Sequence, residues 1–392
     1  MFKGNTLSNY NIATFTLLIM SVQLLYIEGW AVSTPKVLFM ALTPFIMLFR
    51  TQYISKATIY ASLYIVVTLC FLLLKPDFRS STIYYSILFF LTFNLYYNLV
   101  FHENTYTIDD FIRILKGLIY AYAICLVLQQ LCILVGIRYM PLINLMGLSY
   151  YGLFHLNTLA IEPSHAARIL TVFFYGLLKL SQYKNDGTPL RIPELWTDYK
   201  WTIIAFLYTM ICIGSGTAFV GLAILSLYFL KKEYIIAVLV GATTFYMVVP
   251  YIDYEPLTRA IEIFNATLTG DTETITKTDS SAAARVNIIV NTFQNIDLTD
   301  SATWFGARTD NTAMNGKQIV SAIADYGMFS YIAKLIFFFG CCFTSIFSLE
   351  TLMFILLFGM NIGNYAYGFA TLMVFATIKY FKNNYKNEYY LS

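Results

Sequence analysis

Apolar runs of about twenty residues follow one another along almost the whole chain of 392 residues. A helix needs about 20 apolar residues, each rising about 1.5 Å, to cross the hydrocarbon core of a membrane. Only 12% of the residues are charged, whereas a soluble domain carries roughly 25%. This composition excludes a soluble enzyme, a nucleic-acid-binding protein and a disordered chain. The sequence therefore predicts one all-α, polytopic integral membrane domain over residues 1–392.

The runs add up to about twelve transmembrane helices. Two long stretches, 201–230 and 350–379, are interrupted by Gly214-Ser215-Gly216-Thr217 and by Asn361-Ile362-Gly363-Asn364, and we interpret each as two short helices. One kinked helix in each place is the alternative, because glycine is common inside membrane helices. The number of spans stays even in both cases. The other runs lie near 11–28, 31–49, 57–74, 81–101, 111–136, 166–181, 234–250 and 319–343.

The lysines and arginines predict the orientation, since cytoplasmic loops carry an excess of them. With the N-terminus inside, more than half of the 25 basic residues fall in inner segments. Both termini are therefore predicted to be cytoplasmic. The two notable outer segments are 137–165 and the large extracytoplasmic loop 251–318. The short outer loops hold few basic residues: Lys36, Lys75, Arg79, Arg138 and Arg168.

The segment Glu162-Pro163-Ser164-His165 supplies the first candidate site. Proline suits the first turn of a helix, so a helix is predicted to begin here at the outer membrane surface. Residues three apart share a helical face, which brings Glu162, His165 and Arg168 together to handle a proton and an anion. The alternative is a charged helix start, in which Glu162 favours the helix N-terminus and Arg168 extends to the interface.

The other candidates are phosphate-binding groups. Arg285 opens a predicted amphipathic helix over 285–294, and a guanidinium binds phosphate oxygens in pairs. The alternative is an ion pair between Arg285 and Asp279. Arg259 and Arg308 are further candidates in the same loop, although a solvated position also explains Arg308. Ser215 is a candidate because broken helices at membrane depth line cavities and helix N-termini favour anions; a simple turn is the alternative there.

The sequence contains no motif for a metal or a nucleotide. Its six cysteines and three histidines lack the spacing of metal ligands, and no phosphate-binding glycine loop is present. A net charge of +3 is too small to imply nucleic acid as a partner. We therefore expect no cofactor and no metal, and any energy source must be an ion gradient or an activated substrate.

In their order along the chain, these motifs resemble the bacterial O-antigen and capsule repeat-unit polymerases of the Wzy type. Those proteins share a membrane superfamily with the O-antigen ligases. The Glu162 segment is similar to the family's motif before a span, Ser215 to its serine turn, and Arg285 with Gly306 to its outer-loop arginine region. Gly327 is similar to the glycine that closes that loop. The resemblance covers roughly residues 150–345, and the lack of histidine in 251–318 favours a polymerase over a ligase.

The resemblance implies a metal-independent glycosyl transfer on the outer face of the bacterial inner membrane, in O-antigen (lipopolysaccharide) or capsule biosynthesis. The donor would be a glycan on undecaprenyl diphosphate and the acceptor a single lipid-linked repeat unit. Glu162 or His165 would accept the proton of the attacking hydroxyl. Arg285, helped by Arg308 or Arg168, would neutralise the leaving diphosphate. Besides these glycans and membrane lipid, the resemblance allows a chain-length regulator as a partner.

Two other classes of protein fit a chain with so many apolar runs. A lipid-linked oligosaccharide flippase needs ionisable residues buried in its spans and usually has short loops, whereas the candidate residues here lie at the outer edge and in a long loop. A membrane scaffold gives no reason for the shared face of Glu162, His165 and Arg168. The sequence therefore favours the polymerase.

Overall fold

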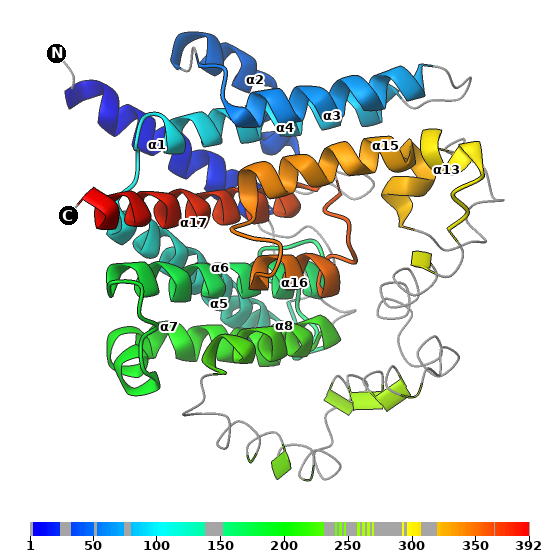
Figure 1. Ribbon diagram of the computed structural model, residues 1–392. Coiled ribbons are helices and arrows are strands. Elements are labelled where there is room, and N and C mark those ends of the chain that lie inside the picture. The colour runs from blue at the N-terminus through cyan, green and yellow to red at the C-terminus, as the bar shows by residue number, and fades with distance from the viewer. Residues whose placement is uncertain are drawn as a thin grey trace.

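The computed structural model describes residues 3–23, 33–50, 53–73, 80–137, 152–230, 292–293, 296–306, 320–363 and 365–391, together with isolated positions between 240 and 269. Every element in this part of the chain is a helix, as the sequence predicts. The long helices lie side by side in a bundle (Figure 1). Helix α1 begins and α17 ends at the same end of this bundle.

The helices follow the apolar runs. The first half of the chain forms α1 (Lys3–Ser21), α2 (Thr34–Arg50), α3 (Lys56–Leu72), α4 (Ser80–Phe101), α5 (Ile108–Leu134) and α6 (Pro163–Lys184). The second half forms α7 (Ile192–Cys212), α8 (Gly216–Ser226), the short η2 (Leu227–Phe229), α13 (Ser301–Phe305), α15 (Ser321–Phe337), the π-helical turn η4 (Phe338–Cys342), α16 (Leu349–Leu356) and α17 (Ala366–Leu391).

Both predicted helix breaks are present. Residues 213–215 separate α7 from α8, and residues 357–365 separate the short α16 from α17. Helix α7 begins before the apolar run at 201, because Pro193 occupies its first turn and Glu194 caps it by accepting a hydrogen bond from the Arg191 N–H. The first part of α7 is thus polar and the second part apolar, and the non-helical backbone of Tyr199 marks the kink between the two parts.

Helices α6 and α17 form the centre of the bundle. Helix α6 packs against α5, α8 and α17, and α17 also packs against α1 and α4. Phe89 of α4 stacks on Phe369 of α17 at 4.9 Å, and Phe174 of α6 stacks on Phe206 of α7 at 4.2 Å. Helix α6 over 166–181 and α17 over 369–381 are buried on nearly all sides, which is the pattern of a helix packed among others.

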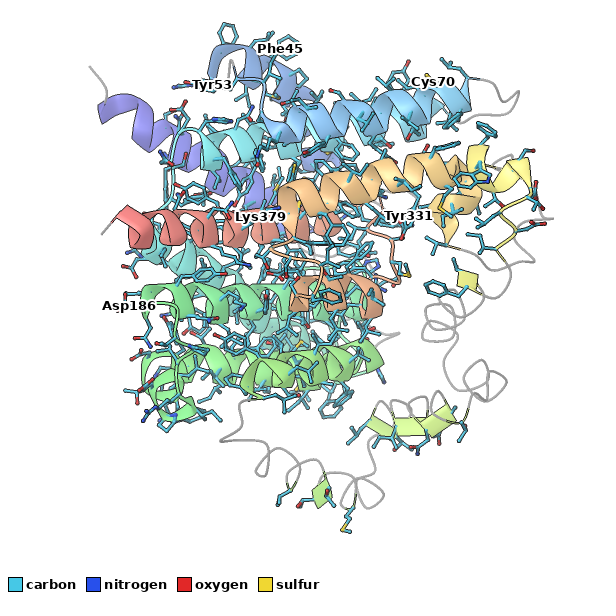
Figure 2. The ribbon with its side chains drawn as sticks, in the orientation of Figure 1. Phe45, Tyr53, Cys70, Asp186, Tyr331 and Lys379 are labelled. Atoms are coloured by element: carbon cyan, nitrogen blue, oxygen red, sulfur yellow. The ribbon has the colours of Figure 1, made fainter. Side chains whose placement is uncertain are left out.

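The outer helices present apolar faces away from the bundle. On α2, Leu38, Leu42, Phe45 and Phe49 share one face and are all more than half exposed. Phe45 points outward in Figure 2, whereas Lys379 points inward. Large exposed apolar faces are typical of contact with lipid. In the described part of the chain, three helices are long and apolar enough to cross a membrane: Ile83–Phe101, Ile108–Leu134 and Ala322–Cys342.

Three predicted features lie outside the described residues, apart from isolated positions. They are the apolar run 234–250, most of the large loop 251–318 and the amphipathic helix 285–294. The part of this loop that is described includes α13, which packs against α15.

Close packing of α6 and α8 predicts that Gly221→Ala destabilises the protein. A Cβ on Gly221 would lie 2.2 Å from Thr171 Oγ1 and 3.3 Å from Met210 Cε. Such overpacking costs about 1–3 kcal/mol, so we expect a lower melting temperature in detergent, measured by circular dichroism. Gly117→Ala is the matched control, because a Cβ on this α5 glycine meets no atom within 4 Å. Equal melting of the two variants would contradict the packing.

Candidate active site

The Glu-Pro-Ser-His segment begins helix α6, as the sequence predicts. Glu162 is the N-cap residue, with φ −133° and ψ 152°, and Pro163 occupies the first turn. Proline is favourable there because the first N–H of a helix has no intrahelical partner. Glu162 Oε2 lies 3.8 Å from His165 Nε2. The predicted pairing of a carboxylate and an imidazole on one face of the helix is therefore present.

Glu162 and His165 differ in their access to solvent. The Glu162 side chain is 59% exposed, whereas that of His165 is only 14% exposed. Ser164 Oγ also donates a hydrogen bond to Glu162 Oε2 over 3.4 Å. A substrate hydroxyl can thus approach the carboxylate directly, with the imidazole behind it. In this arrangement the carboxylate can act as a general base, and the neighbouring imidazole can stabilise its charge.

Tyr367, in the first turn of α17, joins His165 to Arg168. Its ring stacks on the His165 ring with centres 4.3 Å apart. Its hydroxyl accepts a hydrogen bond of 2.9 Å from Arg168 Nη1, and the Arg168 guanidinium lies 5.9 Å from the centre of the Phe358 ring. Arg168 therefore points toward α17, and it connects with His165 through Tyr367.

Sequence reasoning missed this tyrosine. Arg168 and Tyr367 are 199 positions apart, and the chain has 32 tyrosines, so none stands out by composition. The break at 361–364 was the one feature of the sequence that could have indicated this contact. It makes a new helix begin there, and helices that begin at the same end of a bundle bring their first turns together. Tyr365, just before α17, also lies near His165, with ring centres 6.0 Å apart.

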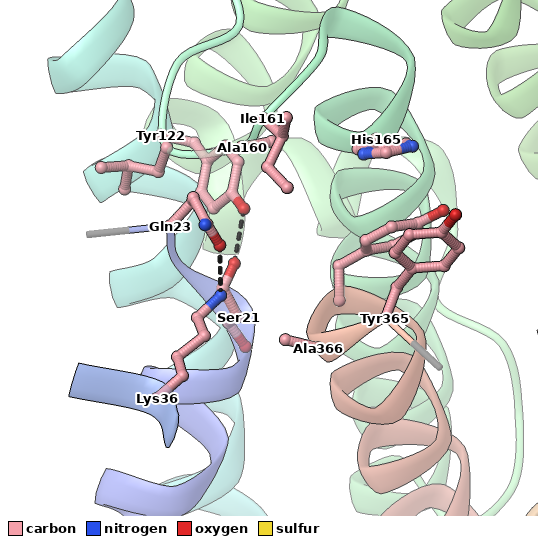
Figure 3. A pocket seen from close by; sticks show the side chains of 11 residues that line it. Ser21, Gln23, Lys36, Tyr122, Ala160, Ile161, His165, Tyr365 and Ala366 are labelled. Carbon is pink, nitrogen blue, oxygen red and sulfur yellow. Dashed lines mark hydrogen bonds between the residues drawn. The ribbon is translucent and has the colours of Figure 1, made fainter. Parts of the chain in front are cut away.

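A cavity of about 30 Å³ lies beside His165 (Figure 3). Inside it, Lys36 Nζ donates a hydrogen bond of 2.7 Å to Gln23 Oε1, and Lys36 is only 3% exposed. Lys36, predicted in a short outer loop, lies instead in the first turn of α2 and is buried there. The cavity is lined by Ser21, Gln23, Lys36, Tyr122, Leu159, Ala160, Ile161, His165, Tyr365, Ala366 and Tyr367.

Buried hydrogen bonds hold the segment that leads into Glu162. Gln129 of α5 accepts from the Thr158 N–H at 3.0 Å and donates to the Thr158 carbonyl at 3.3 Å. Asn157 donates to the carbonyls of Ala160 and Ile161. Both Asn157 and Thr158 are fully buried. The predicted outer segment 137–165 is therefore fixed in its last part, which positions the start of α6.

The break between α7 and α8 packs directly against the same segment. Gly214 has a φ of +64°, and a Cβ there would lie 1.7 Å from the Phe154 carbonyl oxygen. His155 Nδ1 lies 3.0 Å from the Gly214 carbonyl oxygen. Ser215 is the N-cap of α8, and its side chain accepts from the Thr217 N–H at 3.3 Å. Ser215 thus caps a helix and does not line the cavity, and its predicted part in substrate binding stays a prediction.

Gly306 and Gly327, which both belong to the family resemblance, lie in contact. Gly327 forms a kink between the two helical segments of α15, with φ +84° and ψ 162°, so a helical segment begins directly after it. A Cβ on Gly327 would lie 2.6 Å from the Gly306 nitrogen and 2.3 Å from the Trp304 carbonyl oxygen. Only glycine allows this approach. The end of the large loop is therefore attached to α15 at this point.

The remaining predicted residues lie outside the described part of the chain. They are the arginines of the large loop, Arg259, Arg285 and Arg308. Among the described residues, no group of three His, Cys, Asp or Glu side chains is arranged to hold a metal ion. The described candidate site thus consists of the Glu162–His165 pair, Tyr367 with Arg168, and the cavity that contains Lys36 and Gln23.

The Arg168–Tyr367 hydrogen bond predicts a measurable coupling between these residues. Hydrogen bonds to charged groups contribute about 1.5–3 kcal/mol, so a double-mutant cycle of Arg168→Met and Tyr367→Phe should give a coupling of about that size. The free energy of unfolding in detergent provides the measurement. Arg168→Met combined with Tyr228→Phe is the control, because the Tyr228 hydroxyl donates to the Leu178 carbonyl instead. A zero coupling for the first pair would contradict the contact.

Comparison with known proteins adds no relative. No protein-family model, no curated protein and no solved structure matches this chain. Its function is therefore inferred from its own residues and from the geometry described above.

Proposed function

We propose that the protein is a membrane glycosyltransferase of the repeat-unit polymerase type. It joins oligosaccharide repeat units carried on undecaprenyl diphosphate, on the extracytoplasmic face of the bacterial inner membrane, in O-antigen or capsule biosynthesis. The hydroxyl of a lipid-linked acceptor unit attacks the anomeric carbon of the donor glycan. The bond to the lipid diphosphate breaks, and the hydroxyl proton passes to a base on the protein.

The observation that carries this proposal is the Glu162–His165 pair at one end of the bundle. Tyr367 stacks on His165 from the first turn of α17, and α17 ends at the other end of the bundle, where α1 begins. If both termini are cytoplasmic, as the basic residues predict, the pair faces outward. A topology of about twelve spans with both termini inside is part of the proposal.

Glu162 is the better placed of the two bases. Its carboxylate is exposed to an incoming hydroxyl, whereas the His165 ring is nearly covered and stacked on Tyr367. His165 would then stabilise the carboxylate and share the proton it receives. A positioned general base contributes a factor of about 10²–10⁴ to the rate. The donor is already activated by its diphosphate, so the reaction needs no nucleotide.

The leaving diphosphate requires positive charge. Arg285 is proposed to supply it from the large loop, together with Arg308 and Arg259. Arg168 contributes its charge from within the protein, since its guanidinium is held by Tyr367 at 2.9 Å. Groups held ready for the charge that develops usually give the largest catalytic effect.

A flippase is the second candidate, and one observation favours it. Glu350 of α16 is fully buried, with both carboxylate oxygens 3.1 Å from Thr344 Oγ1, and Lys334 of α15 is buried beside Asn361. Ionisable groups buried in spans are typical of transporters. However, both groups have hydrogen-bond partners that belong to helix ends and turns, which is a structural use of their polarity.

Glu162→Gln is expected to stop polymerisation. The amide keeps the size of the side chain but cannot accept the hydroxyl proton, so cells should accumulate single repeat units at normal protein levels. Gel analysis of the glycan ladder measures this. Glu103→Gln, in the turn between α4 and α5, is the matched control and should leave the ladder unchanged. Full-length polymer in Glu162→Gln cells would exclude the assignment. Repeat units trapped on the cytoplasmic side after gene deletion would indicate a flippase, and full-length polymer left on its lipid carrier would indicate a ligase.

Arg285→Ala is expected to give the same single-unit product for a different reason, because the leaving diphosphate loses its main positive partner. Loss of one such group costs about 10²–10³ in rate. Arg113→Ala provides the control, since Arg113 is 76% exposed and pairs with Asp110 within α5. The measurement is polymer synthesis from purified lipid-linked units. Equal rates for the two variants would exclude Arg285 from the site.

A further inference from the structure

The side chain of Lys36 is buried in the wall of the cavity beside His165, and no carboxylate of the described residues is bonded to it. Lys36 is 3% exposed, and its partner within the described residues is the neutral Gln23 Oε1 at 2.7 Å. No ion pair involves Lys36 in that part of the chain. An ammonium group has three donors, so two remain for another acceptor. Burying a charged ammonium is unfavourable unless it is paired, so an anion in this cavity would favour the charged form of Lys36.

Gln23 supplies a second donor at the same place. It is 7% exposed, and its Nε2 is buried without a hydrogen-bond partner among the described residues. The orientation of the amide follows from Lys36, because exchanging oxygen and nitrogen would set two donors against each other. Figure 3 shows the Lys36 ammonium and the Gln23 amide meeting on the wall of the cavity opposite His165 and Tyr365. The cavity thus contains two adjacent buried donor groups.

Three helices begin around this cavity. Helix α2 starts two residues before Lys36, α6 starts two residues before His165, and Ala366 at the start of α17 lines the wall. Each helix N-terminus carries partial positive charge and free N–H groups. Together with the Lys36 amine and the Gln23 amide, whose Nε2 has no partner among the described residues, these helix ends would favour an anion in the cavity.

We propose that this cavity binds a phosphoryl oxygen of the prenyl diphosphate that carries the glycan, with Lys36 and Gln23 as its ligands. The proposal rests on the polymerase function proposed above. A volume of about 30 Å³ accepts one water-sized group, so a single oxygen enters while the rest of the diphosphate stays outside the cavity. The first two helices, together with the large loop, would thus contribute to holding the leaving group.

The test uses the full-length protein in detergent micelles and farnesyl diphosphate as a short, soluble probe. Calorimetry should show that Lys36→Met weakens binding about tenfold or more, the loss expected for a charged hydrogen bond. Lys334→Met is the matched control, because Lys334 is also buried and bonded to an amide oxygen, that of Asn361 at 3.1 Å. It should bind the probe as the unchanged protein does.

Gln23→Glu separates binding from folding. The new carboxylate would lie beside Lys36 Nζ and occupy the place of the anion. We expect this variant to keep or raise its melting temperature without ligand, while farnesyl diphosphate no longer raises it. Inorganic pyrophosphate should stabilise the unchanged protein less than farnesyl diphosphate, and farnesol should not stabilise it.

Two results would overturn the proposal. One is unchanged binding of farnesyl diphosphate to both Lys36→Met and Gln23→Glu. The other is equal stabilisation by farnesol, which would mean that the prenyl tail alone is recognised. Failure of the polymerase function looks different: the deletion strain would make normal polymer, while diphosphate binding would still depend on Lys36.

Discussion

Every backbone break inside this bundle needs a polar partner from the protein itself, because lipid offers none. The structure meets this requirement with long side chains. The Tyr331 hydroxyl donates to the Met360 carbonyl at 2.8 Å, in the break between α16 and α17. In the same break, Lys334 donates to the side-chain amide oxygen of Asn361 and so fixes a residue of the break without bonding its backbone. Lys379 donates to the carbonyls of Phe339 and Gly340, where η4 leaves the α-helical pattern. Breaks are thus found where such a donor can reach them.

The candidate site depends on these breaks, because it is assembled from helix ends. The break before α17 lets a new helix begin beside the start of α6, and this is what brings Tyr367 against His165 and Arg168. The break before α8 fixes the segment that contains His155, which leads into Glu162. Without the break before α17, no new helix would begin beside the start of α6, and Tyr367 would not lie in a first turn next to His165.

The sequence predicted much of this arrangement, for identifiable reasons. Length and apolarity were enough for the helices, Pro163 for the start of α6, and the glycine and asparagine clusters for both breaks. The i,i+3 spacing was enough for the Glu162–His165 pair. Contacts between distant segments were not predictable: Tyr367 is one tyrosine among many, and the burial of Lys36 depends on α1 and on residues 159–161. Periodicity describes one helix face, and it contains no information on which other helix covers it.

Glu162 differs from the other described α-helix N-cap residues that carry an acceptor. Five of them use the side chain to bind the first-turn backbone: Ser55, Thr107, Ser215, Asp300 and Ser348. Glu162 forms no such bond, because short side chains suit this position and glutamate is longer. Aspartate or serine would stabilise the start of α6 better. The carboxylate is instead directed toward His165 and remains open to solvent, so the local preference for a capping residue is not met at the residue that we propose as the base.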